Sequence, residues 1–158
     1  MLAGAAAELI GLPVAFELSI ANVDKPSLSL EDVRRRLAPF AWQANVWLTR
    51  APTFVEKARL FPKAVFVVGV DTAARILAPR YYPEVTETAM MVALGEVRQF
   101  GCRFLVAGRV DNGGQFIELA DLPIPAHSAD LFQAVPRNVF RADISSTSFR
   151  ATTGVTPA

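Results

Sequence analysis

The sequence has very little of the chemistry that metal centres and disulfide-stabilised proteins require. Its 158 residues include one cysteine, Cys102, and one histidine, His127. A single thiol excludes an intramolecular disulfide, and together with a single imidazole it excludes a zinc site built from cysteine and histidine ligands. Low cysteine usage is typical of proteins in a reducing compartment, so we expect a cytoplasmic protein.

Long apolar runs and an excess of charge are also missing. No apolar run reaches about 18 residues, the length that a membrane-spanning helix needs, so we expect no membrane partner. Sixteen basic and fifteen acidic side chains leave a formal net charge of +1, which excludes nucleic-acid binding driven by bulk positive charge. The sequence has no Gly-x-Gly-x-x-Gly segment and no Gly-Lys-Ser/Thr phosphate loop, which disfavours dinucleotide-binding dehydrogenases and kinases.

What the chain does contain is an ordinary globular composition, with 52% apolar and 20% charged residues. This length is typical of one domain and suffices to bury a core without disulfides. We therefore expect one domain over residues 1–150, followed by a frayed tail at residues 151–158.

Strand patterns recur along the chain and are separated by helix patterns. The predicted strands are Val14–Ile20, Asn45–Thr49, Ala64–Val70 and Arg103–Val110. Ala64–Val70 is almost continuously apolar, which is typical of a strand covered by helices on both faces. The alternation predicts a layered α/β fold with a mainly parallel sheet.

The predicted helices lie before and between these strands. They are the opening segment Met1–Gly11, Leu30–Phe40, Phe54–Phe61, Asp71–Leu77 and Glu84–Phe100. Ser29 precedes the second helix and Gly101 follows the last, in the positions that capping residues take. After Val110, an Asp-Asn-Gly-Gly turn predicts a hairpin in which Gln115–Leu119 pairs antiparallel with the preceding strand.

The segment ISSTSFR near the C-terminal end carries the clearest candidate site. Ser145, Ser146 and Thr147 begin a predicted helix, and Arg150 follows one turn later. Backbone N–H groups at a helix start, hydroxyl donors and a guanidinium together suit a bound phosphate. The alternative is that Asp143 and Ser145 serve only as helix caps.

Further candidates follow the predicted strands, where ligands bind in open α/β sheets. Gly69 and Asp71 come at the end of the third strand, Lys25 follows the first, and Arg109 ends the fourth. A glycine allows close approach of a ligand, a carboxylate accepts hydrogen bonds from a sugar or an amide, and a lysine neutralises phosphate. The alternatives are a tight turn capped by Asp71, a solvated Lys25 and an ion-paired Arg109.

Three of these segments together resemble a known family. ISSTSFR is similar to the Ile-Ser-Ser-Thr-x-x-Arg signature of the nucleotidylyltransferase (cytidylyltransferase-like) superfamily, nearest its nicotinate/nicotinamide mononucleotide adenylyltransferase branch. VGVDTAARI followed by RYY resembles the family's Gly-x-Asp segment, and NVDKP resembles the segment with a phosphate-contacting lysine. Their order and spacing fit, and the resemblance extends from Leu2 to Arg150.

The resemblance implies a Rossmann-like fold and a specific reaction. A nucleoside triphosphate, ATP with Mg²⁺, would be joined to a phosphorylated small molecule such as nicotinate or nicotinamide mononucleotide, with release of pyrophosphate. Neither a membrane nor a nucleic acid would take part.

The resemblance also implies roles for most of the candidates. The residues expected to hold the nucleotide are Gly69, Asp71, Arg109, Ser145, Ser146, Thr147 and Arg150. The last four would contact the β and γ phosphates, while Gly69 and Asp71 would line the nucleotide site. Lys25 would bridge the reacting phosphates as the catalytic residue, and Arg109 joins the set from its place at a strand end.

One part of the family pattern is absent. The family's first strand ends in a His-x-Gly-His turn that leads into the first helix, whereas this sequence begins in that helix. Its one histidine, His127, lies far along the chain. Because the loss of one preorganised donor costs about 100- to 1,000-fold in rate, we expect this chain to be inactive alone.

The missing strand belongs between Val14–Ile20 and Ala64–Val70 in the family order. Either those two strands meet directly, or something else, such as another chain, fills the gap. Apolar side chains there, Phe16, Leu18, Val67 and Val68, are expected to be left uncovered and to favour a homo-oligomer.

Two explanations of this absence compete. In the first, the native protein carries the strand and its histidines upstream of Met1, in some relatives behind an amidase-like domain. In the second, the short form is a non-catalytic nucleotide-binding or protein-interaction domain.

Overall fold

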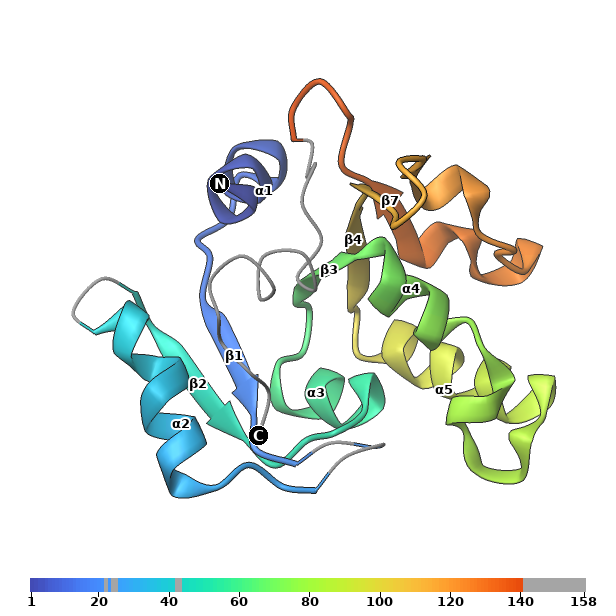
Figure 1. Ribbon diagram of the computed structural model, residues 1–158. Helices are drawn as coiled ribbons and strands as arrows, with labels where there is room; N and C mark the ends of the chain where they lie inside the picture. Colours follow the sequence, from blue (N-terminus) through green and yellow to red (C-terminus); the bar gives the residue numbers. More distant parts are fainter. Residues whose placement is uncertain (22, 24–25, 42–43, 141–158) are drawn as a thin grey trace.

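The computed structural model describes residues 1–21, 23, 26–41 and 44–140, and helices and strands alternate through this part of the chain (Figure 1). The helices are α1 (Leu2–Ile10), α2 (Leu30–Leu37), α3 (Phe54–Leu60), α4 (Val70–Ile76) and α5 (Glu87–Gln99). The strands are β1 (Phe16–Ser19), β2 (Val46–Thr49), β3 (Val65–Gly69), β4 (Arg103–Ala107), β5 (Arg109–Val110), β6 (Phe116–Ile117) and β7 (Phe132–Ala134). Short 3₁₀ helices are η1 (Ala38–Phe40), η2 (Pro79–Tyr81), η3 (Pro83–Val85), η4 (Leu119–Asp121) and η5 (Ala126–Leu131).

Local signals in the sequence set the ends of several helices. Ser29, Thr53 and Thr86 each accept a hydrogen bond from the backbone N–H three residues on, at the starts of α2, α3 and α5. Such N-caps satisfy N–H groups that have no partner within the helix. Helix α1 ends at Gly11, whose φ of 70° is left-handed, a conformation that glycine adopts without strain.

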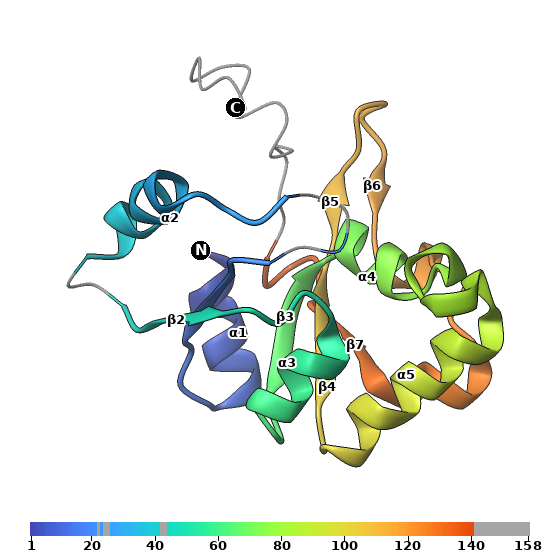
Figure 2. The ribbon, with the colours of Figure 1, turned by 90° about the horizontal axis from the view of Figure 1, so that it is seen from below.

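The strands form parallel sheets, so the predicted α/β class is confirmed. Strands β1 and β2 pair in parallel, and β3, β4 and β7 form a second parallel sheet in the order β3-β4-β7. Strands β5 and β6 pair antiparallel and extend as a hairpin beyond the carboxyl end of β4, the central strand of the second sheet (Figure 2). The predicted antiparallel partner after the Asp-Asn-Gly-Gly turn is thereby confirmed.

Two strand predictions need correction. Of the two arrangements left open for β1 and β3, direct pairing is wrong, because in the described residues β1 pairs only with β2 and does not meet β3. The expected strand Arg103–Val110 is split at Gly108 into β4 and β5, since the chain turns there to pair with β6. Strand β7 was not anticipated, because it is three residues long.

Helices cover both faces of the β3-β4-β7 sheet (Figure 1). On one face, side chains of β3, β4 and β7 pack with α3, α4 and α5 in the larger core, which includes Val68, Phe104, Val106 and Phe132. On the other face, α1 contributes Ala6 to a smaller core with Leu105, Ala107 and Val135. Successive side chains of a strand point to opposite faces, so β4 supplies both cores.

The β1–β2 sheet contacts η1 on one face. The rings of Phe16 and Phe40 meet there with centroids 4.7 Å apart. Phe16, Leu18 and Val67 are half-buried, but Val68 is only 8% exposed, so the expectation that Val68 is uncovered is wrong. Val68 lies on the face of β3 that α3, α4 and α5 cover.

Within the described part of the chain, no helix combines the length and the apolar character needed to cross a membrane.

Phe104 is the side chain on which the larger core is centred. It is fully buried, and its ring contacts those of Phe54, Phe66 and Phe132 with centroids 5.2, 6.0 and 5.0 Å away. We expect Phe104→Ala to lower the free energy of unfolding by about 3–5 kcal/mol, as measured by urea denaturation. The control Val92→Ala, at a position 60% exposed on α5, should change it by less than about 0.5 kcal/mol. Equal effects of the two substitutions would contradict this description of the core.

Candidate functional site

The carboxyl ends of β3 and β4 lie side by side and bring three candidate residues together. In the parallel register, Gly69 of β3 pairs with Ala107 of β4. Strand β3 passes directly into α4, which carries Asp71, and β4 passes through Gly108 into β5, which carries Arg109. Asp71 comes two positions after Gly69, and Arg109 comes two positions after Ala107. Both charged residues therefore lie at the same edge of the sheet.

Asp71 and Arg109 form an ion pair. Nε of Arg109 lies 2.6 Å from Oδ2 of Asp71. Within the described part of the chain, the Nε–H group nevertheless makes no hydrogen bond of good geometry, although the atom is buried. The two observations are consistent, because opposite charges attract each other even when the N–H bond does not point at the carboxylate. The structure therefore contains the ion pair that the sequence analysis gave as the alternative role of Arg109.

The two partners of this pair differ in exposure. The Asp71 side chain is 59% exposed, whereas that of Arg109 is 27% exposed. The arginine is therefore held by its surroundings, and the aspartate faces solvent at the beginning of α4.

Gly69 has an extended backbone and open space beside it. Its φ and ψ are −77° and 158°, which any residue adopts. Apart from its two chain neighbours, no heavy atom of the described residues lies within 4 Å of a Cβ added at Gly69. The described part of the fold does not require glycine here and leaves space beside it.

Gly108 is a second glycine at this edge, and sequence reasoning overlooked it. A Cβ at Gly108 would lie 2.7 Å from the Phe116 ring and 2.8 Å from the Ile117 carbonyl oxygen. The β5–β6 hairpin therefore packs directly on this glycine and fixes where Arg109 leaves the sheet. The sequence did carry a signal for this role, because its pattern changes at Gly108 from a buried strand to a hairpin.

The other site residues expected from the sequence lie outside the described residues. They are Lys25, Ser145, Ser146, Thr147 and Arg150. The structure therefore brings together Gly69, Asp71 and Arg109 of the predicted set.

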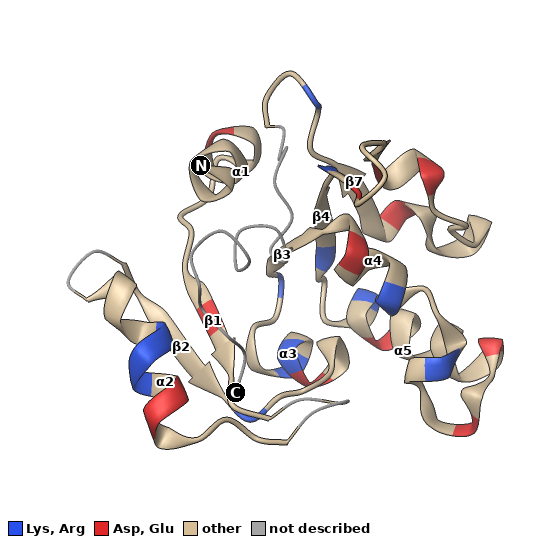
Figure 3. Cartoon of the chain, viewed as in Figure 1, with Lys and Arg blue, Asp and Glu red and all other residues tan. Residues whose placement is uncertain are grey.

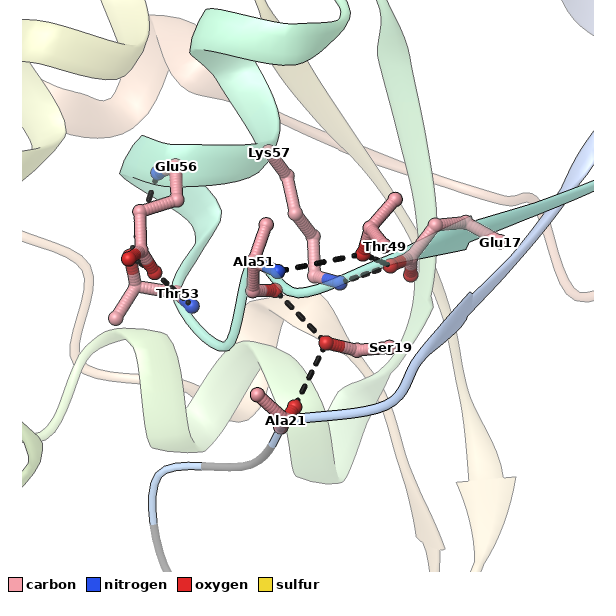
Figure 4. A network of polar contacts seen from close by, with 8 residues as sticks. All are labelled: Glu17, Ser19, Ala21, Thr49, Ala51, Thr53, Glu56 and Lys57. Carbon is pink, nitrogen blue, oxygen red and sulfur yellow. Dashed lines mark hydrogen bonds and ion pairs between the residues drawn. The ribbon is translucent and has the colours of Figure 1, made fainter. Parts of the chain in front are cut away.

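A network of polar side chains at the ends of β1 and β2 was also overlooked (Figure 4). Oε1 of Glu17 accepts hydrogen bonds from Nζ of Lys57, at 2.6 Å, and from the hydroxyl of Thr49. The Ser19 hydroxyl donates to the Ala51 carbonyl at 3.0 Å. Lys57 is only 8% exposed. Because these groups bind one another, the network joins the β1–β2 sheet to α3, which is a structural role.

The remaining titratable candidates do not add to the site. Cys102 is 2% exposed, and burial raises the pKa of its thiol, so it stays protonated and unreactive at neutral pH. His127 lies in η5, where its backbone carbonyl accepts a hydrogen bond from Arg98. No group of three or more acidic, cysteine or histidine side chains in the described ranges is placed to hold a metal ion. Basic and acidic residues are distributed over both sheets and their helices (Figure 3).

Comparisons with known proteins found no matching family model, no similar curated protein and no similar solved structure.

The two glycines at the site are expected to respond oppositely to an added methyl group. Gly108→Ala forces the Cβ against a ring and a backbone oxygen, so it should destabilise the protein by about 1–3 kcal/mol. Gly69→Ala meets open space at an unstrained φ and should leave stability unchanged or raise it by up to about 1 kcal/mol. Thermal unfolding of the two variants measures the difference. A loss of stability in Gly69→Ala that matches the loss in Gly108→Ala would disprove the assignment.

The Glu17–Lys57 pair is expected to contribute to stability. Glu17→Ala leaves the Lys57 ammonium without its carboxylate in a site where the lysine side chain is 10% exposed. We expect a loss of about 1.5–3 kcal/mol, the usual range for hydrogen bonds to charged groups. The control is Arg35→Ala, which removes the exposed pair with Asp32 and should cost less than about 1 kcal/mol. Denaturant unfolding compares them, and a smaller loss for Glu17→Ala than for the control would refute this role.

Proposed function

We propose that the chain is a Rossmann-like nucleotidylyltransferase domain that binds ATP at the carboxyl ends of β3 and β4. The reaction of such a domain joins the nucleotide to a phosphate monoester, such as nicotinate or nicotinamide mononucleotide, and releases pyrophosphate. The observation that carries the proposal is the Asp71–Arg109 pair beside the open space at Gly69. These residues come from the segments that the family resemblance and the strand ends singled out.

The architecture supports this location. Helices cover both faces of the β3-β4-β7 sheet, and in sheets of this kind ligands bind beyond the carboxyl ends of the strands. A guanidinium provides the donor fork that phosphate oxygens accept, and a carboxylate accepts hydrogen bonds from ribose hydroxyls. The site thus offers a guanidinium for the phosphates of a nucleoside triphosphate and a carboxylate for its ribose.

The other proposed roles rest on the resemblance. Ser145, Ser146, Thr147 and Arg150 hold the β and γ phosphates, and Lys25 neutralises charge between the reacting phosphates. Mg²⁺ bound with ATP is implied by the same resemblance and would offset phosphate charge.

We propose binding without turnover for this chain alone. Phosphoryl and nucleotidyl transfer depend on fixed donors around the phosphate that carries the developing charge. The family places two histidines there, and this sequence contains one histidine, in η5.

A second candidate function is a non-catalytic nucleotide-binding or protein-interaction domain. The observation that favours it is the absence of the His-x-Gly-His motif from the sequence. A pure interaction domain should bind no nucleotide, which separates it from the first proposal.

Calorimetry with ATP and Mg²⁺ tests the proposed function. Arg150→Ala should weaken ATP binding by about 1.5–3 kcal/mol, or roughly 10- to 100-fold. Arg103→Ala is the matched control, because Arg103 is an exposed arginine at the opposite, amino end of β4, and it should leave the affinity unchanged. Equal ATP affinity in the wild type and Arg150→Ala would defeat the assignment, and no binding in either would favour the interaction domain. Pyrophosphate release in the presence of a mononucleotide acceptor would contradict the expected inactivity.

A further inference from the structure

We propose that Asp71 competes with phosphate for Arg109, so that the site opens to a ligand by exchange of partners. This inference rests on the proposed function and extends it to the way in which the same site selects its ligand. The carboxylate occupies the guanidinium that a phosphate takes. A ligand that carries phosphate displaces Asp71, and the released carboxylate then accepts a hydrogen bond from a ligand hydroxyl.

The geometry of the ion pair makes it easy to exchange. Nε of Arg109 lies 2.6 Å from Oδ2 of Asp71, yet among the described residues the N–H group makes no hydrogen bond of good geometry. A charge-assisted hydrogen bond is strong only when the N–H points at its acceptor. The Asp71–Arg109 pair therefore keeps its Coulomb attraction but lacks a well-aligned hydrogen bond at Nε. A phosphate oxygen aligned with the N–H groups of Arg109 makes that hydrogen bond.

Exposure indicates which partner moves. More than half of the Asp71 side chain is exposed, whereas Arg109 is about one quarter exposed with its Nε buried. Rotation of the short aspartate side chain toward solvent uncovers little apolar surface. Arg109 also follows directly after Gly108, where the hairpin packs with no room for a methyl group. Arg109 is thus the fixed member and Asp71 the member that gives way.

The exchange selects a class of ligand. A singly charged anion gains little from a guanidinium that already has a carboxylate beside it. A polyphosphate carries enough charge to displace the carboxylate, and a nucleoside triphosphate also brings ribose hydroxyls for the displaced Asp71. Inorganic pyrophosphate has the charge to displace the carboxylate, but it has no ribose hydroxyl to donate to Asp71. The pair therefore favours nucleoside polyphosphates over free pyrophosphate, the product of the proposed reaction.

Calorimetry with Mg²⁺-pyrophosphate and Mg²⁺-ATP tests the exchange in Asp71→Asn. The neutral amide no longer holds Arg109 by charge, so pyrophosphate should bind about three- to tenfold more tightly than in the wild type. ATP should gain less, because the amide oxygen is a weaker acceptor for the ribose hydroxyl. The preference for ATP over pyrophosphate should therefore fall by at least about threefold.

Asp130→Asn is the matched control. Asp130 pairs with Arg98 at 2.7 Å on η5, so this variant changes the net charge equally and also breaks an Arg–Asp pair. Both ligands should bind it as they bind the wild type. All variants should unfold at the wild-type temperature within a few degrees, because both aspartates are more than half exposed.

The outcomes separate this inference from the proposed function. Unchanged or weaker pyrophosphate binding in Asp71→Asn, or an equal gain for both ligands, would overturn the exchange while ATP binding stands. ATP binding that is lost in Arg150→Ala but unchanged in Arg109→Ala would overturn it as well. Failure of the wild type to bind either ligand would overturn the exchange together with the proposed function.

Discussion

The fold depends on one carboxylate, that of Glu17, which ties together two parts of the molecule that share no sheet. Glu17 lies on β1, and its Oε1 atom accepts hydrogen bonds from Thr49, at the end of β2, and from Lys57 in α3. Helix α3 in turn places Ala58 in the larger core. Burial of a lysine that is 8% exposed costs free energy unless a partner such as this carboxylate satisfies its ammonium group. In the described residues, this contact, the ring contact between Trp47 and Phe61, and the chain links from α1 to β1 and from β2 to α3 hold the β1–β2 sheet to the core.

The sequence predicted most elements because their signals are local. The caps at Ser29 and Thr53, and the apolar run of β3, depend on residues within a few positions of one another. The residue pattern left open whether β1 and β3 meet, because strand pairing depends on contacts between distant segments. Lys57 shows the same limit, because its partner Glu17 lies 40 positions away in the sequence.

The positions of three candidate residues follow the rule for parallel sheets. Because parallel strands end at the same edge, Gly69, Asp71 and Arg109 were expected together, and the structure brings them together. Their pairing with each other depends on the path of the hairpin after Gly108, which the residue pattern does not encode. The family resemblance supplied chemistry for Ser145 to Arg150 that geometry in the described residues does not address.

The base and the tip of the nine-residue hairpin after Gly108 have different structural roles. At its base, the glycine contact with Phe116 and Ile117 fixes the direction of the backbone. At its tip, Asp111 accepts hydrogen bonds from the N–H groups of Gly113 and Gln115, so the turn is closed by its own side chain. These bonds lie within the tip and do not involve the glycine contact at the base. A change of an exposed side chain at the tip can therefore alter what approaches the sheet edge without moving the arginine at its foot.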